Sequence, residues 1–112
     1  MAGKFELYKD NRGGFRFRLK AGNGQNILSS EGYKQRIGAL KGVDSVRKNA
    51  PDDARYERKE TKNGQQKFNL KAGNGQIIGA SESYSSLAGR EKGIASVKKN
   101  ASDAKLIDLT DV

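Results

Sequence analysis

The side chains that could do chemistry in this chain are mostly cations carried by alternating segments. In residues 15–21, apolar side chains alternate with Arg16, Arg18 and Lys20. Because successive side chains of a strand point to opposite faces, this pattern predicts a half-buried strand with a basic outer face. The alternating residues 4–10 add Tyr8 to that face. Some single-stranded nucleic-acid binders combine cations that follow the phosphates with rings that stack on bases, so this face is a candidate binding site.

The same arrangement returns later in the chain, where Lys67, Asn69 and Lys71 occupy the matching positions and Arg55 and Lys59 lie alongside. The alternative interpretation is a solvated sheet face, because Glu6 and Glu57 neutralise part of the charge. The predicted binding residues are Tyr8, Arg16, Arg18, Lys20, Arg55, Lys59, Lys67 and Lys71.

Catalytic patterns are missing from the sequence. It contains no cysteine and no histidine, which excludes disulfides, thiolate chemistry and the commonest general base and metal ligand. Ser45 and Ser96 could pair only with Lys41 or Lys92, and no oxyanion hole is indicated. The pairs Glu31/Tyr33 and Glu82/Tyr84 are interpreted as a glutamate at a helix start followed by a ring packed on the sheet edge. We therefore expect no enzyme activity, no cofactor and no metal.

Two glycine-rich segments, residues 22–24 and 73–75, could be mistaken for phosphate-binding loops. Such loops lead from a strand into a helix, whereas here a strand is expected to follow a strand. The Asn-Gly pair in each segment predicts a type I′ hairpin turn, in which both central residues have positive φ.

The organisation of the chain is a tandem repeat. Residues 19–25 (LKAGNGQ) recur unchanged as 70–76, and residues 48–50 (KNA) recur at the same offset as 99–101, without a gap. Each copy predicts three strands, at about 4–10, 15–21 and 25–30 in the first copy, with Ile27 as the surest core residue of the third. A helix should follow. The tail from Ile107 to Val112 either adds a short strand or stays loose.

The expected helix of the first copy carries Ile37, Leu40, Val43 and Val46 at helical spacing, and that of the second copy carries Leu87, Ala88, Ile94 and Val97. Ser30 or Ser81 could cap the helix start, with Ser85 an equal candidate in the second copy. Gly42 and Gly93 lie within the pattern, so a bend or a break is expected there. Asn49 and Asn100 are candidate left-handed caps, and Pro51 ends the first helix.

Several stretches resemble a known family. They are the Phe-Glu-Leu opening at 5–7, the strand and turn at 17–25, the Ser-Glu-x-Tyr step at 30–33 and the helix end at 93–100. Together they resemble the YegP-like family of small bacterial proteins built from one or two such modules. The resemblance implies an α+β fold with antiparallel strands and two helices, and it implies no activity and no site residue. Arg58 and Lys59 stand where the first copy has Leu7 and Tyr8, so the two halves are not expected to be fully symmetric.

We therefore predict an α+β fold in which residues 1–53 and 54–112 are two strand-strand-strand-helix repeats that pack into one compact unit with pseudo-twofold symmetry. Such packing buries a core that one copy could not build alone. One continuous sheet and two facing sheets are both compatible with the pattern. An internal pseudo-dimer makes a monomer the expected state.

The charge balance bears on function. The chain has 22 basic and 13 acidic residues, a net charge of +9, which attracts anionic partners. It shows no signal peptide and no apolar run that could span a membrane, so a cytoplasmic location is expected. The first hypothesis is a binding module for nucleic acid or an acidic protein. The alternative is a protein-interaction or structural module that uses sheet edges. The third hypothesis is an enzyme acting on a small acidic substrate, which is supported by the positive charge alone.

Overall fold

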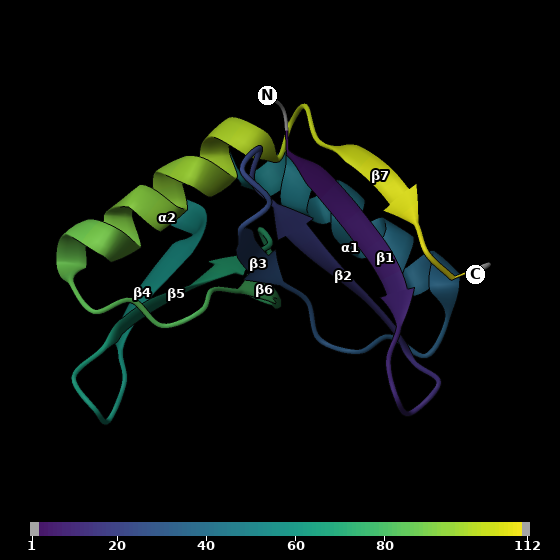
Figure 1. Ribbon diagram of the computed structural model, residues 1–112, viewed down its shortest axis with the longest axis horizontal. Helices are drawn as coiled ribbons and strands as arrows, with labels where there is room; N and C mark the ends of the chain where they lie inside the picture. Colours follow the sequence, from purple (N-terminus) through teal and green to yellow (C-terminus); the bar gives the residue numbers. More distant parts are fainter. Residues whose placement is uncertain (1–2, 111–112) are drawn as a thin grey trace.

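The computed structural model describes residues 3–110 and contains seven strands and two long helices (Figure 1). The elements of the first copy are β1 Lys4–Lys9, β2 Phe15–Lys20, β3 Asn26–Ser29 and α1 Arg36–Asn49. A short 3-10 turn, Asp53–Arg55, leads into the second copy, which consists of β4 Tyr56–Glu60, β5 Gln66–Lys71, β6 Ile77–Ala80 and α2 Leu87–Asn100. The chain then adds β7 Lys105–Asp108. The α+β class and the duplicated module are confirmed.

All seven strands belong to one sheet, in the order β4-β5-β6-β3-β2-β1-β7. The halves meet where β3 and β6 run antiparallel and share the single pair Ser29 and Ala80. An approximate twofold axis, vertical in Figure 1, passes through this junction and exchanges the left and right halves. The choice between one sheet and two is thus resolved as one sheet, held at its centre by a very short pairing.

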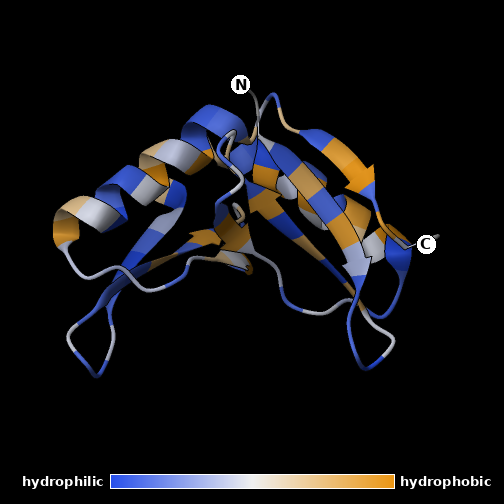
Figure 2. Cartoon of the chain, in the orientation of Figure 1, coloured by the Kyte–Doolittle hydropathy of each residue, from blue (hydrophilic) through white to orange (hydrophobic). Residues whose placement is uncertain are grey.

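The core lies between one face of the sheet and the two helices. Phe5, Leu7, Phe17 and Leu19 of the first half are fully buried, as are Phe68 and Leu70 of the second. Alternating hydrophobic and hydrophilic residues are visible along β1 and β2 in Figure 2. Each helix also crosses the junction, since α1 packs against β5 and β6, and α2 packs against β3. Neither half closes its core alone.

The hairpin turns differ from the predicted type I′. At residues 21–25, Gly24 N donates to Ala21 O and Ala21 N donates to Gln25 O, both at 2.9 Å. Only Gly24 has positive φ (87°), and among residues 3–110 no residue other than glycine does. This is a three-residue loop with a type I turn and a left-handed glycine. The Asn23 side chain accepts from Gln25 N, which holds the turn. The prediction failed because an Asn-Gly pair suits both loops.

The helices begin later than predicted. Helix α1 has Gln35 at its N-cap without a side-chain cap, and α2 is capped by Ser86, whose hydroxyl accepts from Gly89 N. The predicted caps Ser30, Ser81 and Ser85 are therefore wrong. Ser30 Oγ accepts from Phe17 N instead and donates to Glu31 O. Ser81 does the same with Phe68 N and Glu82 O.

The helices are unbroken at their internal glycines, so the predicted break is wrong. A Cβ at Gly42 would lie 2.6 Å from Tyr33 Oη and 2.8 Å from Phe17 Cε2. The Tyr33 ring stacks on Phe17 with ring centroids 6.2 Å apart. Tyr84 packs against Phe68 and Gly93 in the same way. Glycine is present because a tyrosine approaches the helix closely, not because the helix breaks.

The predicted apolar stripe needs correction in the first turn of each helix. Ile37 and Leu87, in the first turns of the helices, are 54% and 59% exposed, because those turns project beyond the core, and Ala88 is exposed too. Val43, Val46, Ile94 and Val97 are buried as predicted. The left-handed caps are also wrong. Asn49 and Asn100 are helical and donate back to Ser45 O and Ser96 O.

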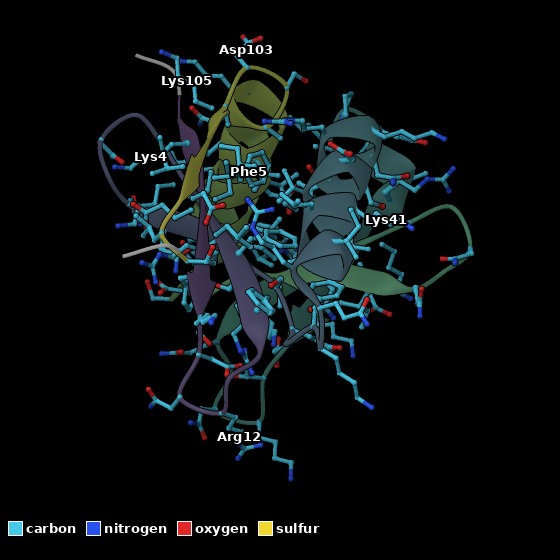
Figure 3. All side chains as sticks on the ribbon, turned by 90° about the vertical axis from the view of Figure 1, so that its right-hand side faces the viewer. Lys4, Phe5, Arg12, Lys41, Asp103 and Lys105 are labelled. Carbon is cyan, nitrogen blue, oxygen red and sulfur yellow. The ribbon has the colours of Figure 1, made fainter. Side chains whose placement is uncertain are left out.

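The tail forms β7, which runs parallel to β1 and makes the sheet mixed. Its bounds are Lys105–Asp108, so it begins before Ile107, and residues 111 and 112 of the predicted tail lie outside the described residues. Asp108 binds Arg36 at the start of α1. Figure 3 shows Lys4 on β1 near Lys105 on β7, as the register requires.

At the opposite edge, no strand within residues 3–110 covers β4. Arg58 replaces Leu7 and points toward α2, where its Nε lies 3.0 Å from Glu91. Arg58 also binds Asp53 at 3.0 Å, and Lys98 binds the same carboxylate at 2.7 Å. An inward-pointing charge is a known protection against edge-to-edge pairing. Arg58, the departure from symmetry noted in the sequence, thus protects the β4 edge with charge. In the first half the equivalent edge, β1, is covered by β7.

Candidate functional site

With the exception of Arg55, the predicted basic residues lie on the sheet face opposite the helices, which we call the basic face. Cross-strand partners share a face, and the register pairs Tyr8 with Arg16, and Lys59 with Lys67. One row of paired residues crosses the junction from Arg18 through Ser29, Ala80 and Asn69. The two predicted groups of cations therefore form one surface. The residues of the basic face are Lys4, Glu6, Tyr8, Arg16, Arg18, Lys20, Asn26, Ser29, Glu57, Lys59, Lys67, Asn69, Lys71, Ile77 and Ala80.

Glu6 organises the first group of cations. Its carboxylate lies 2.7 Å from Arg18 Nε, 3.3 Å from Lys20 Nζ and 3.4 Å from Lys4 Nζ. The hydrogen bond from Arg18 holds the pKa of Glu6 below its ordinary value, although partial burial opposes this. Three cations thus share one buried carboxylate. They are held in place and keep a net positive charge.

Glu57, the counterpart of Glu6, organises the second group. It accepts from Asn69 Nδ2 and from Lys71 Nζ, both at 3.1 Å, and lies 3.8 Å from Lys59 Nζ. The Asn69 hydrogen bond is the main reason that the pKa of Glu57 is lowered. Asn69 replaces the Arg18 of the first half, so this group carries less charge.

Arg16 and Lys67 occupy equivalent positions on either side of the junction. Arg16 Nε lies 3.0 Å from Asp10, and this contact lowers the pKa of that carboxyl. Arg16 Nη1 also donates to Ser30 O at 3.4 Å, which orients the guanidinium along the sheet. Lys67 forms no ion pair with any residue in the range 3–110. Its charge is available to a ligand.

The Tyr8 ring already contacts another side chain of the basic face. The Arg18 guanidinium lies over its ring, with 4.3 Å between Cζ and the ring centroid. One face of the ring is therefore covered by a cation, and the ring and guanidinium form a stacked pair. In the second half Lys59 stands in place of Tyr8, so the stacking platform exists only once.

Arg55 lies beside the other cations but on a different element. It ends the 3-10 turn before β4, and its Nε lies 3.7 Å from Asp52. Its guanidinium approaches Gly73 in the loop between β5 and β6. Arg55 is thus at the margin of the basic face.

Several residues of this face were not among the binding residues predicted from the sequence. Lys4 points to it by the same alternation that places Tyr8, so the signal was present. Ser29, Ala80 and Ile77 belong to it because they pair with Arg18, Asn69 and Lys71 on the neighbouring strands. The sequence did not specify that β3 and β6 then meet at the junction. Ser29, Ile77 and Ala80 line a pocket of about 570 Å³, which Arg16 and Lys67 flank.

The other chemical candidates have structural explanations. Glu31 lies several residues before the start of α1, so the predicted helix-terminal glutamate is wrong. Tyr33 pairs with Phe15 as an isolated bridge and packs on Phe17, and its burial raises the pKa of its hydroxyl. Ser45 and Ser96 hydroxyls accept from Asn49 and Asn100. Within residues 3–110 no group of histidine, cysteine, aspartate or glutamate is placed to hold a metal ion.

Neither helix within residues 3–110 is long and apolar enough to cross a membrane. The fold is that of a two-copy α+β module whose sheet is covered on one face only. Residues 10–57 and 61–108 each match the family described as domain of unknown function DUF1508. The chain therefore belongs to the DUF1508 family, also called UPF0339, which agrees with the YegP-like resemblance.

Relatives match over nearly their whole length. A UPF0339 protein of Stutzerimonas stutzeri, from the 5′ region of a ptx operon, is 62% identical over 97% of this chain and 98% of its own. The UPF0339 protein YegP of Escherichia coli K12 is 53% identical over 98% of this chain and all of its own.

Two solution NMR structures have the same fold. That of the Escherichia coli yegP protein, of unknown function, matches with a TM-score of 0.94 and 52% identity, covering all of this chain and 97% of its own. That of a UPF0339 protein of Shewanella oneidensis matches with a TM-score of 0.93 and 49% identity, covering 98% and 93%.

Proposed function

We propose that this protein is a non-enzymatic, monomeric binding module of the cytoplasm that holds nucleic acid on its basic face. The observation that carries the proposal is the gathering of cations from both halves on one continuous sheet face. Glu6 and Glu57 each hold several donors without cancelling them. A field of like charge over an open face suits a polyanion.

The form of the surface also favours binding over catalysis. Its cations are spread along four strands and do not converge on one point, as they would around a reacting group. Phosphates repeat along a nucleic acid, so a spread of cations matches them, and each phosphate contact releases counterions. Affinity should therefore fall steeply with salt.

The test compares two variants of equal net charge. In the first, Arg18, Lys20 and Lys71 are changed to Gln, which keeps a donor for Glu6 and Glu57. In the second, three exposed helix lysines, Lys41, Lys48 and Lys99, are changed to Gln. Binding of short fluorescent oligonucleotides to the nuclease-treated proteins is measured across a salt series.

We expect the first variant to bind more weakly and its log–log salt slope to become shallower by about 2, since each lost contact to a single strand contributes about 0.7. The second variant should bind like the wild type. Equal losses in both variants would mean that net charge alone acts, and the basic face would not be a site. Binding of an acidic polypeptide in preference to nucleic acid would shift the proposal to an acidic protein partner.

A second candidate function is supported by the β7 edge. Leu106 and Ile107 are 37% and 38% exposed there, in contrast to the charged β4 edge, and an extended peptide could pair with β7. Recovery of one stoichiometric protein partner after nuclease treatment, lost in an Ile107→Lys variant, would favour this function. Equal recovery with both proteins would count against it.

A further inference from the structure

A pocket of about 570 Å³ lies at the pseudo-twofold junction, in the middle of the basic face. It exists because short side chains at the junction lie between longer ones. Ser29 and Ala80, the single pair joining β3 and β6, are small, whereas Arg16 and Lys67 at the wall of the pocket are long. The depression is thus a consequence of how the two copies are joined.

The charges around the pocket balance, unlike those of the rest of the basic face. Arg16 and Lys67 lie on its wall, and so do Glu31 and Glu82, which are exposed. A phosphate entering it would meet two carboxylates as well as two cations. A neutral group with both donors and acceptors fits this lining better than an anion does.

The floor of the pocket is apolar. Ile77 is 40% exposed and faces this side of the sheet, opposite Lys71 in the register, and Ala80 adds its methyl group. The hydroxyls of Ser30 and Ser81 are already engaged with the backbone and offer little to a ligand. An apolar floor with a polar rim suits a flat ring whose edge carries hydrogen-bonding groups.

We propose that this pocket takes one unpaired nucleobase from a single-stranded nucleic acid. The inference rests on the proposed function, because the phosphates on either side of that base lie on the cations of the basic face. The ring lies on Ile77 and Ala80, while Arg16 and Lys67 donate to its edge and Glu31 or Glu82 accepts from it. The bases of a duplex are stacked and paired, so a duplex cannot fill the pocket without extruding a base.

The experiment uses the full chain and three probes. They are a single strand of about a dozen nucleotides, the same strand with its bases removed at consecutive central positions, and the corresponding duplex. The variant Ala80→Leu fills the pocket from a half-buried strand position. Ala88→Leu makes the same change at an exposed position of α2 and is the matched control. Circular dichroism confirms that both variants are folded.

We expect the wild type to prefer the intact single strand, and Ala80→Leu to lose roughly 5-fold in affinity for it. This is the lower end of the range for a base stacked on an aromatic side chain, because Ile77 and Ala80 present no ring. Affinity for the duplex and for the strand without central bases should change little, and Ala88→Leu should match the wild type. Equal affinity of the wild type for strand and duplex, unchanged in Ala80→Leu, would overturn the pocket and leave the basic face as a site. No binding to any probe would overturn both.

Discussion

The helix glycine Gly42 offers a quantitative test of the packing. An alanine at an ordinary interior helix position stabilises by about 1 kcal/mol relative to glycine. Here the added methyl group would lie 2.6 Å from Tyr33 Oη and 2.8 Å from Phe17 Cε2. Phe17 is fully buried and cannot move aside, so the overpacking cost falls near the upper end of about 1–3 kcal/mol. The net expectation for Gly42→Ala is a loss of about 2 kcal/mol in the free energy of unfolding.

The control for this change is Gly38→Ala in the first turn of the same helix. The nearest atom to a Cβ there is Tyr33 Cδ1 at 3.3 Å, which asks for only a small adjustment. Gly38→Ala should therefore be neutral or stabilising by up to about 1 kcal/mol. The assay is urea unfolding followed by circular dichroism, with the slope of the transition checked for constancy.

A double variant separates the two obstacles. Tyr33→Phe removes the hydroxyl and leaves the Phe17 contact, so Gly42→Ala combined with Tyr33→Phe should recover part of the loss. A Gly42→Ala protein as stable as the wild type would refute the close approach of Tyr33 and with it the explanation of the helix glycines.

Three further predictions test other parts of the fold. Ser30→Ala leaves the buried Phe17 N–H without its acceptor and should lower the free energy of unfolding by about 1–3 kcal/mol, measured by urea unfolding; no change would contradict this role. Hydrogen bonds from Lys98 and Arg58 lower the pKa of Asp53 from 3.8 to about 2. Because the folded state then binds this proton less readily than the unfolded chain, the stability from Asp53 is present above pH 3.8 and lost as the pH falls through 2. Acid unfolding of Asp53→Asn should differ from that of the wild type above this window and converge with it below, and parallel curves throughout would count against the contact. Arg58→Leu with Glu91→Leu copies Leu7 and Leu40 of the first half, exposes an apolar edge and should cause self-association in sedimentation; a monomeric variant would show that these charges do not protect β4.

Much of the fold follows from local patterns. The alternation in residues 4–10 and 15–21 correctly predicts β1 and β2 and the face to which each side chain points, which is why the basic cations were found together. The constant offset between the copies predicts the second half from the first. These signals are strong because each reflects burial, repeated along the chain.

Other features depend on contacts between distant residues and leave no local trace. Serine is a common helix cap, but the Ser30 hydroxyl instead accepts from Phe17 N. Glycine often breaks a helix, but Gly42 instead leaves room for Tyr33. The single pair of Ser29 and Ala80 decides that there is one sheet, and a pairing this short has no signature in sequence. The junction pocket could therefore not be predicted. The sequence contains every residue that lines it but does not show that they come together.

We propose that nucleic acid binds to the basic face. The most direct measurement is a chemical-shift titration of the isotope-labelled protein with a short single-stranded oligonucleotide at low salt. We expect the shifts to concentrate on the amides of β2, β3, β5 and β6 and to be reversed by added salt. Shifts confined to the helices, or none at all, would contradict binding at the basic face.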